Sequence, residues 1–182
     1  MNNVDNIINR GFDVVNLPGY VFNKKFRSYL FFDDDFCSSE ELVKEIQSLL
    51  NMIFEKKTEC HIFSQLNGGC ICSLEMCADW VKEINAIRTK MHDDGDYYGL
   101  IIIDSEEQWA IFQKSPVDDG VIAIDVSQST LNDYTSKCDF FFNCEDVNKW
   151  IGDEIRKDPE YIKKSSYLYL SALTKNYCAA VV

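Results

Sequence analysis

The chain has 182 residues, a size typical of one domain, and 46% of them are apolar, which is enough to fill a hydrophobic core and excludes general disorder. Its formal net charge of −12 disfavours binding to the phosphate backbone of nucleic acids. Residues 1–9 lack a signal-peptide pattern and the apolar runs are too short to span a bilayer, so we expect a cytoplasmic protein.

The first third of the chain predicts short strands followed by one helix. We expect strands at 12–17, 20–22 and 27–32, because these segments are rich in β-branched and aromatic residues. A helix is predicted over 38–57, where Ser38 and Glu41 form a capping-box pattern at its start. Its apolar side chains recur at helical spacing: Leu42, Ile46, Leu49, Leu50 and Ile53.

A hairpin and a second helix are predicted next. Strands at 59–65 and 70–72 flank the turn 67–69, in which glycine supplies a positive φ without strain. Ser73 is the expected N-cap of a helix that ends near Met91. The apolar positions of that helix form one stripe: Leu74, Cys77, Trp80, Val81, Ile84 and Ile87.

Three strands follow in quick succession at 97–103, 108–113 and 120–126. The connections between them are too short for a parallel crossover, so an antiparallel meander over about 97–126 is predicted. In its last strand Ile122, Ile124 and Val126 should share a buried face, with Asp125 pointing away.

The C-terminal third predicts a further strand at 138–142 and two helices. Asn143 should cap a helix over about 144–157, and Asp158-Pro159 should begin a last helix. Residues 1–182 are therefore predicted to be a single α+β domain, with a mostly antiparallel sheet, a central meander and four helices packed on it.

Eight cysteines lie along the chain, and without an export signal we expect free thiols, including those of Cys37, Cys138, Cys144 and Cys178. Five potential metal ligands are concentrated in one region: Cys60, His61, Cys70, Cys72 and Cys77. Zinc needs four such ligands in a tetrahedral arrangement, but this spacing matches no standard pair of metal-binding cysteines. A zinc- or thiol-dependent enzyme that uses the region from Cys60 to Cys77 stays open as an alternative.

Other catalytic patterns are weak. Cys60 and His61 are adjacent in a predicted strand, so their side chains should point to opposite faces and not form a nucleophile–base pair. The loop 92–96 offers oxygen ligands around Gly95 but lacks the later bidentate acid of a calcium loop. There is no phosphate-binding glycine loop and no basic face interleaved with aromatics, so no cofactor, nucleic acid or membrane is predicted as a ligand.

Negative charge is concentrated in one part of the chain. Residues 93–154 contain 15 acidic side chains and three lysines. Two turns of the predicted meander are acidic and should lie at opposite ends of its middle strand, where carboxylates can attract the Lys and Arg side chains of a basic partner. The predicted partner-binding residues are the acids of these turns and one nearby aromatic: Asp104, Glu106, Glu107, Trp109, Asp118 and Asp119.

The stretch YYGLIIIDSEEQWAIFQKSPVDDGVIAID, residues 97–125, contains a Trp-x-Ile strand followed by a Gly-Val-Ile strand. In this stretch, and in its size, acidity and α+β make-up, the chain resembles immunity proteins of bacterial polymorphic and contact-dependent growth inhibition toxin systems. The resemblance implies a non-enzymatic cytoplasmic inhibitor that binds a cognate basic toxin domain of the nuclease type. It brings no functional residues with it, because these inhibitors share a role more than a set of residues. A structural or phage-type accessory protein without a ligand is the remaining alternative.

Overall fold

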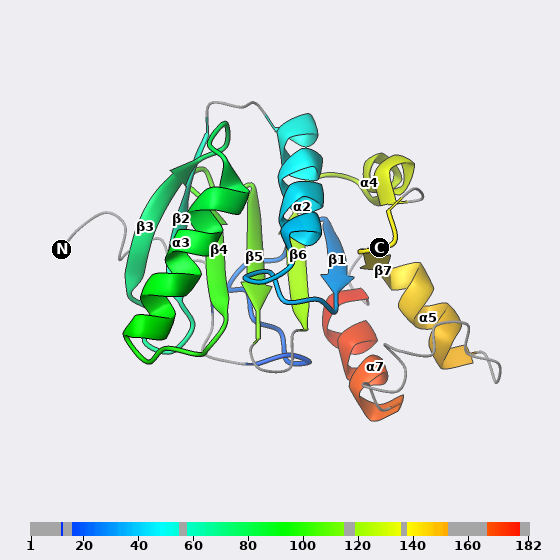
Figure 1. Ribbon diagram of the computed structural model, residues 1–182. Helices are drawn as coiled ribbons and strands as arrows, with labels where there is room; N and C mark the ends of the chain where they lie inside the picture. Colours follow the sequence, from blue (N-terminus) through cyan, green and yellow to red (C-terminus); the bar gives the residue numbers. More distant parts are fainter. Residues whose placement is uncertain are drawn as a thin grey trace.

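The structure is a computed structural model that describes residue 12 and residues 16–54, 58–114, 119–135, 138–152 and 167–178. Seven strands form one antiparallel sheet in the order β3-β2-β4-β5-β6-β1-β7 (Figure 1). The strands are β1 (Ser28–Phe32), β2 (Glu59–Ser64), β3 (Cys70–Glu75), β4 (Leu100–Asp104), β5 (Trp109–Gln113), β6 (Gly120–Ile124) and β7 (Phe142–Asn143). The predicted α+β class is confirmed.

The central meander is also confirmed, because β4, β5 and β6 are consecutive antiparallel neighbours. The first strand of the chain, β1, lies beside β6 and so extends the meander at its far side. The predicted strand at 12–17 falls largely outside the described residues. Its first residue, Phe12, forms an isolated antiparallel bridge with Phe22.

Helix α2 (Glu40–Ile53) follows the predicted apolar stripe, but its N-cap is Ser39 and not Ser38. Ser39 Oγ accepts a hydrogen bond from the Leu42 amide at 3.4 Å. Ser38 lies one residue before the cap, and its hydroxyl donates to Asp35 Oδ2 at 2.5 Å. The capping-box prediction was therefore one residue early.

Helix α3 (Trp80–Asp93) begins later than predicted. The segment expected to start it, 73–75, instead continues β3 and pairs with β2. The true N-cap is Asp79, whose carboxylate accepts from the Lys82 amide at 3.2 Å. Consequently Cys77 lies in an exposed turn and not on the apolar stripe of a helix.

The C-terminal part contains α4 (Gln128–Thr135), α5 (Cys144–Gly152), α7 (Tyr167–Leu173) and a π-helical turn, η1 (Thr174–Cys178). The sequence did not predict α4. Asn143 caps α5 as predicted, because its Oδ1 accepts from the amides of Glu145 and Asp146 at 2.8 and 3.1 Å. The expected start of a helix at Asp158-Pro159 lies outside the described residues.

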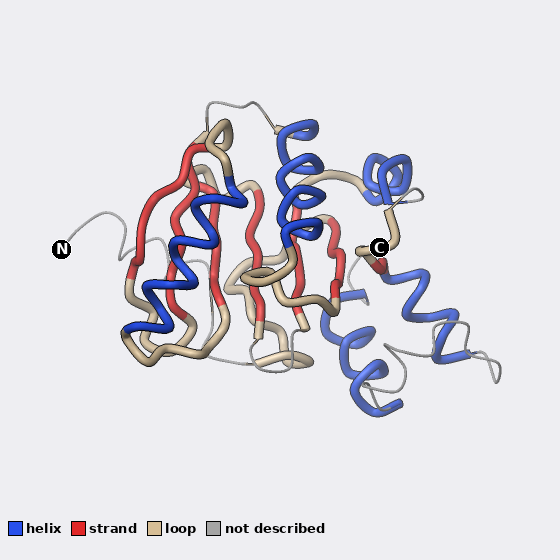
Figure 2. Tube along the Cα trace, viewed as in Figure 1, coloured by secondary structure: helices blue, strands red, loops and turns tan. Residues whose placement is uncertain are grey.

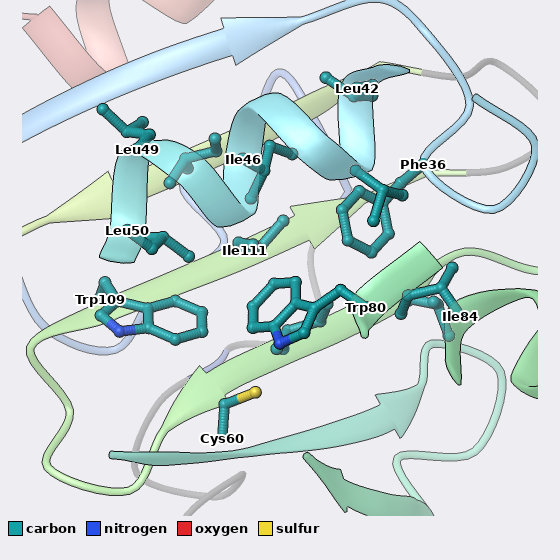
Figure 3. Close-up of a cluster of buried hydrophobic side chains, with 14 of the residues drawn as sticks. Phe36, Leu42, Ile46, Leu49, Leu50, Cys60, Trp80, Ile84, Trp109 and Ile111 are labelled. Carbon is teal, nitrogen blue, oxygen red and sulfur yellow. The ribbon is translucent and has the colours of Figure 1, made fainter. Parts of the chain in front are cut away.

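Both faces of the sheet are buried, by different parts of the chain. Helices α2 and α3 lie over one face, as Figures 1 and 2 show. Trp80 and Trp109 meet beneath α2 with ring centroids 6.1 Å apart, and Cys60 lies on the other side of this pair (Figure 3). Ile122 and Ile124 are buried on this face as predicted, and Val126 packs against it.

The second face is covered by an aromatic cluster from the N-terminal segment together with α5, α7 and η1. The ring of Tyr177 contacts Tyr20, Tyr29 and Phe31, and its hydroxyl donates to the carbonyl of Gly19 at 2.7 Å. Burial of each large side chain of this kind stabilises the fold by roughly 1.5–3 kcal/mol. The segment around Gly19 and the η1 turn are thereby packed together on one face of the sheet.

The prediction of free thiols was wrong for two of the eight cysteines. Cys144 and Cys178 form a disulfide that joins the start of α5 to the end of η1, with their Cα atoms 5.6 Å apart. The cause is tertiary: α5 and η1 pack on the same face of the sheet and bring together two residues 34 positions apart. The other six cysteines are free.

Candidate functional site

The predicted partner-binding residues do not form one exposed surface. Asp104 and Trp109 have no exposed surface and belong to the interior, and Asp119 is 5% exposed and accepts a hydrogen bond from the Tyr169 hydroxyl at 2.8 Å. Glu106 is exposed, Glu107 is half-buried, and Asp118 lies outside the described residues. Burial therefore removes three of these six residues from direct contact with a partner.

The two acidic turns of the meander lie at opposite ends of β5, as predicted, because one precedes Trp109 and the other follows Gln113. A lysine already lies at the first of these ends. The ammonium of Lys24 is 3.0 Å from Asp125 Oδ2 and also donates to the carbonyl of Glu107. Part of the negative charge at this turn is thus neutralised within the fold.

Two other aspartate-rich loops meet at the opposite end of the sheet. Residues 33–35 follow β1, and residues 93–96 follow α3 and precede β4. The end of β1, the end of β5 and the end of α3 all lie at this end of the molecule (Figure 1). Between the loops is a cavity of about 270 Å³, which we call the Asp–Tyr pocket. It is lined by Asp35, Cys37, Arg88, Met91, His92, Asp96, Tyr97, Tyr98, Gly99 and Gln113.

The carboxylate of Asp35 is held by the buried end of β5. Gln113, 1% exposed, donates from Nε2 to Asp35 Oδ1 at 3.3 Å and to the carbonyl of Asp34 at 3.2 Å. Asp35 Oδ1 also accepts from the Cys37 amide at 3.0 Å. Because Gln113 further accepts from the Phe36 amide at 3.1 Å, one buried amide fixes the whole loop after β1.

Asp96 is fixed by its own loop and by β2. Its Oδ1 accepts from the Tyr98 amide at 3.0 Å, and its Oδ2 accepts from the Ser64 hydroxyl at 2.5 Å. Gly99 lets the following strand approach β5, since a Cβ at this position would lie 1.8 Å from the carbonyl oxygen of Gln113. Asp96 and the two tyrosines are therefore presented from a constrained backbone.

The aromatic rings of this site are unusually open for residues beside a hydrophobic core. Tyr97 is 59% exposed and Tyr98 is 51% exposed. The ring of Tyr97 packs edge-on against the His92 imidazole, with centroids 4.5 Å apart. Arg88, also exposed, is the permanent cation among the lining residues. The pocket thus combines carboxylates, flat aromatic surface and one guanidinium.

A second cavity, of about 250 Å³, adjoins the Asp–Tyr pocket and shares Met91 and Asp96 with it. It lies against the β2–β3 turn, and its polar lining includes Asn67, Lys90 and Asp94. Asp96 therefore separates two hollows and is accessible to a ligand in either one. A larger cavity of about 350 Å³, beside α2, has a mainly apolar lining and Glu45 as its one carboxylate. We choose the Asp–Tyr pocket as the candidate site because of its carboxylates, exposed tyrosines and guanidinium, and not because of its volume.

The region from Cys60 to Cys77 does not assemble in the way a zinc site would require. A register shift in the β2–β3 pair places Cys72 opposite Ile62 and Cys70 opposite Phe63, which lie in the cores of opposite faces. Cys70 and Cys72 therefore face opposite sides of the sheet, although residues two apart on a regular strand share a face. Among the described residues no three His, Cys, Asp or Glu side chains converge on a common metal position.

The thiols near the candidate site are poor nucleophiles. Burial, with a contribution from the negative charge of Asp35, raises the pKa of the Cys37 thiol to about 12. Burial also raises the pKa of the Cys60, Cys72 and Cys138 thiols. Since the thiolate is the reactive form, these four residues are protonated at neutral pH and do not support cysteine catalysis.

Comparisons of the chain with protein-family models, with curated proteins and with solved structures find no match. Within the described ranges, every helix is too short or too polar to cross a lipid bilayer. We therefore identify this candidate site from the geometry of its residues and not from a known relative.

The sequence contained the parts of this site but not their proximity. The aspartates of 33–35 directly follow the predicted strand at 27–32, and the loop 92–96 lacks the pattern of a calcium site. The signal that pointed to them is Tyr97-Tyr98 directly after an aspartate-rich turn, since tyrosines are enriched at protein interfaces. Only the position of β1 in the sheet brings the two loops together.

Proposed function

We propose that this protein is a non-enzymatic acidic binding protein of the toxin-immunity type, which neutralises a basic, nuclease-type toxin domain through the Asp–Tyr pocket and the aspartates around it. The observation that carries the proposal is the meeting of two aspartate-rich loops around two tyrosine rings that are more than half exposed. Aromatic side chains in such positions supply much of the affinity of protein interfaces.

Charge and aromatic surface have separate roles in this proposal. The aspartates of 33–35 and 93–96, within a chain of net charge −12, accelerate encounter with a basic partner. Tyr97 and Tyr98 provide rigid contact area that is desolvated on binding. Arg88 sets specificity, because it repels a partner that presents only cations at that point. Asp104 and Trp109 are buried at the opposite end of the sheet and have no part in this site.

The test uses a basic, nuclease-type domain, sought first in the gene directly upstream of this one, which is purified and titrated with this protein. Asp96→Asn and Tyr98→Ala should each weaken binding roughly tenfold or more, as expected for central interface residues. The association rate should fall steeply between about 50 mM and 500 mM salt, because exposed charges are screened over that range.

Glu106→Gln is the matched control, since it removes one exposed negative charge at the opposite end of the sheet. It should leave the dissociation constant nearly unchanged. An equal loss of affinity in Glu106→Gln and Asp96→Asn would place the interface elsewhere. A salt-independent association rate would remove the electrostatic part of the proposal.

A further inference from the structure

We propose that the Asp–Tyr pocket accepts an arginine side chain of the partner, with its guanidinium paired to Asp96 and lying against the ring of Tyr98. This inference rests on the proposed function for the identity of the partner, but the pocket can be tested by itself. Three features carry it: the unused acceptor positions of Asp96, the open ring of Tyr98 and the balance of charge around the cavity.

Asp96 is arranged as a bidentate acceptor. A carboxylate offers about four lone-pair positions, two on each oxygen. In Asp96 each oxygen accepts one hydrogen bond from the fold, from Tyr98 N on Oδ1 and from Ser64 Oγ on Oδ2. With respect to the residues that the structure describes, one position on each oxygen therefore stays open, which matches the two parallel N–H groups of a guanidinium. Asp35 is less suited, since Oδ1 already accepts from Cys37 N and Gln113 Nε2, and Oδ2 from Ser38 Oγ.

Tyr98 provides the surface against which a planar cation can stack. Its backbone amide is bonded to Asp96, so the ring and the carboxylate belong to the same constrained turn. The ring of Tyr97 is packed against His92, whereas Tyr98 makes no ring contact with the described residues. An arginine that pairs with a carboxylate and stacks on an aromatic ring gains from both contacts. A lysine ammonium lacks the planar fork and gains less from this geometry.

The negative charges around the pocket favour a cationic ligand, and one positive charge opposes it. Asp93 and Asp94 are exposed next to Asp96 and add negative charge. Arg88 lies in the same lining and opposes a cationic ligand. The two effects predict opposite signs for two substitutions, which gives a sharper test than loss of binding alone.

The experiment measures binding of N-acetyl-arginine amide and N-acetyl-lysine amide to the whole protein by NMR, following the Tyr98 amide. We expect the arginine probe to bind several-fold more tightly than the lysine probe. Asp96→Asn should lower the affinity for the arginine probe about tenfold, and Arg88→Gln should raise that affinity two- to threefold. Tyr98→Phe should keep the affinity for the arginine probe, whereas Tyr98→Leu should lower it several-fold, because only phenylalanine retains an aromatic face.

The variants are chosen to preserve the fold. In Asp96→Asn the new Oδ1 can still accept from the Tyr98 amide, and Nδ2 can donate to Ser64 Oγ, so both local hydrogen bonds survive. The dispersion of the remaining amide signals checks this directly. Glu106→Gln again controls for loss of one charge and should leave probe binding unchanged.

Equal affinity for the two probes, or an unchanged affinity in Asp96→Asn, would overturn the inference. Tighter binding of the arginine probe, weakened by Asp96→Asn and strengthened by Arg88→Gln, would support it. If the probe binds in this way but the upstream basic domain does not, the proposed function fails and the arginine site stands. If the basic domain binds with no effect of Asp96→Asn on the probe, the arginine site fails and the proposed function stands.

Discussion

Cys60 and Asp104 face each other across the β2–β4 pair, and neither residue has any exposed surface. Asp104 Oδ2 accepts from the Gln108 amide at 3.1 Å, while Oδ1 is buried with no hydrogen-bond partner in the described part of the chain. Burial raises the pKa of Asp104 above its ordinary value, and the charge of Asp104 adds to the effect of burial in raising the pKa of Cys60. A carboxylate in the core is thus retained at a cost to stability at neutral pH.

Asp104→Asn should make stability less dependent on pH. The folded state holds the Asp104 proton more tightly than the unfolded state, so the stabilisation is complete below the unfolded pKa, near 3.8, and is lost as pH rises through the folded pKa. Asparagine does not ionise, so this decrease of stability with rising pH disappears. Its side-chain oxygen can still accept from the Gln108 amide. Urea unfolding between about pH 4 and pH 8 should therefore show a flatter profile, with the largest gain in the free energy of unfolding at neutral pH.

Asp139→Asn, at an exposed site, is the control for Asp104→Asn. The free energy of unfolding of Asp139→Asn should depend on pH in the same way as that of the wild type. Parallel profiles for wild type and Asp104→Asn would contradict the assignment of this pH dependence to Asp104.

Gly120→Ala should destabilise the sheet by roughly 1–3 kcal/mol, the usual cost of overpacking a core. Gly120 pairs with Phe32 across β1 and β6, and a Cβ at this position would lie 1.9 Å from Phe32 Cζ. The ring of Phe32 has no exposed surface and so has no room to move aside.

A double-mutant cycle of Gly120→Ala with Phe32→Leu, measured by chemical unfolding, isolates this clash. The Gly120→Ala penalty should shrink in the Phe32→Leu background. A penalty of equal size in both backgrounds would assign the effect to backbone conformation instead.

Much of the architecture followed from sequence because the relevant signals are local. The apolar spacing of α2 and the short connections of the meander each specify one arrangement. At the start of α2 two neighbouring serines offered the same capping signal, and the helix uses Ser39 rather than Ser38. In the second helix the error came from β3, which extends through Ser73 because pairing with β2 outweighed the local capping signal.

The candidate site was not predictable in the same way. Burial of Asp104, Trp109 and Asp119 depends on what covers each face of the sheet, and sequence spacing alone does not reveal it. Likewise, Asp35 and Asp96 are 61 positions apart and meet only because β1 joins the sheet beyond β6. A one-dimensional charge count located the acidic segment 93–154 but not the half of the pocket that comes from the loop after β1.

Lys24→Met should lower the free energy of unfolding by about 1 kcal/mol or less. Its ion pair with Asp125 is about a third exposed and therefore screened, but the ammonium also donates to the Glu107 carbonyl and lies 4.5 Å from the Phe26 ring centroid. Methionine keeps the apolar length of the side chain. A cycle with Asp125→Asn should give a coupling energy that decreases in high salt, and a coupling of zero would show that the pair does not stabilise the fold.

The disulfide should be evident in a thiol count. Denatured protein kept free of reductant should titrate six thiols from its eight cysteines, and all eight after reduction. Cys144→Ser should lower the stability of oxidised protein by roughly 2–4 kcal/mol, because the bond closes a loop of 34 residues. The same substitution should have a much smaller effect in reducing buffer, and eight titratable thiols without reductant would contradict the pairing.

Thiol reactivity should separate exposed from buried cysteines in the folded protein. Cys70 and Cys77, the two exposed thiols, should alkylate first with iodoacetamide at pH 8. Cys37 should react far more slowly, since its pKa is raised to about 12 and little thiolate is present at that pH. Peptide mapping by mass spectrometry would measure the order of labelling, and rapid labelling of Cys37 would contradict its raised pKa.

The position of β1 in the sheet means that this strand pairs late during synthesis of the chain. Ser28 pairs with Ile124, and Leu30 with Asn143, so this strand must wait for most of the polypeptide before it finds its neighbours. Until then the apolar segment SYLFF is a short, β-prone sequence of the kind that aggregates. It is bracketed by positive side chains before it and three aspartates after it, and charges at such flanks act as gatekeepers against aggregation. Asp35, which lines the pocket in the folded protein, thus also belongs to the charged flank of an aggregation-prone segment in the nascent chain.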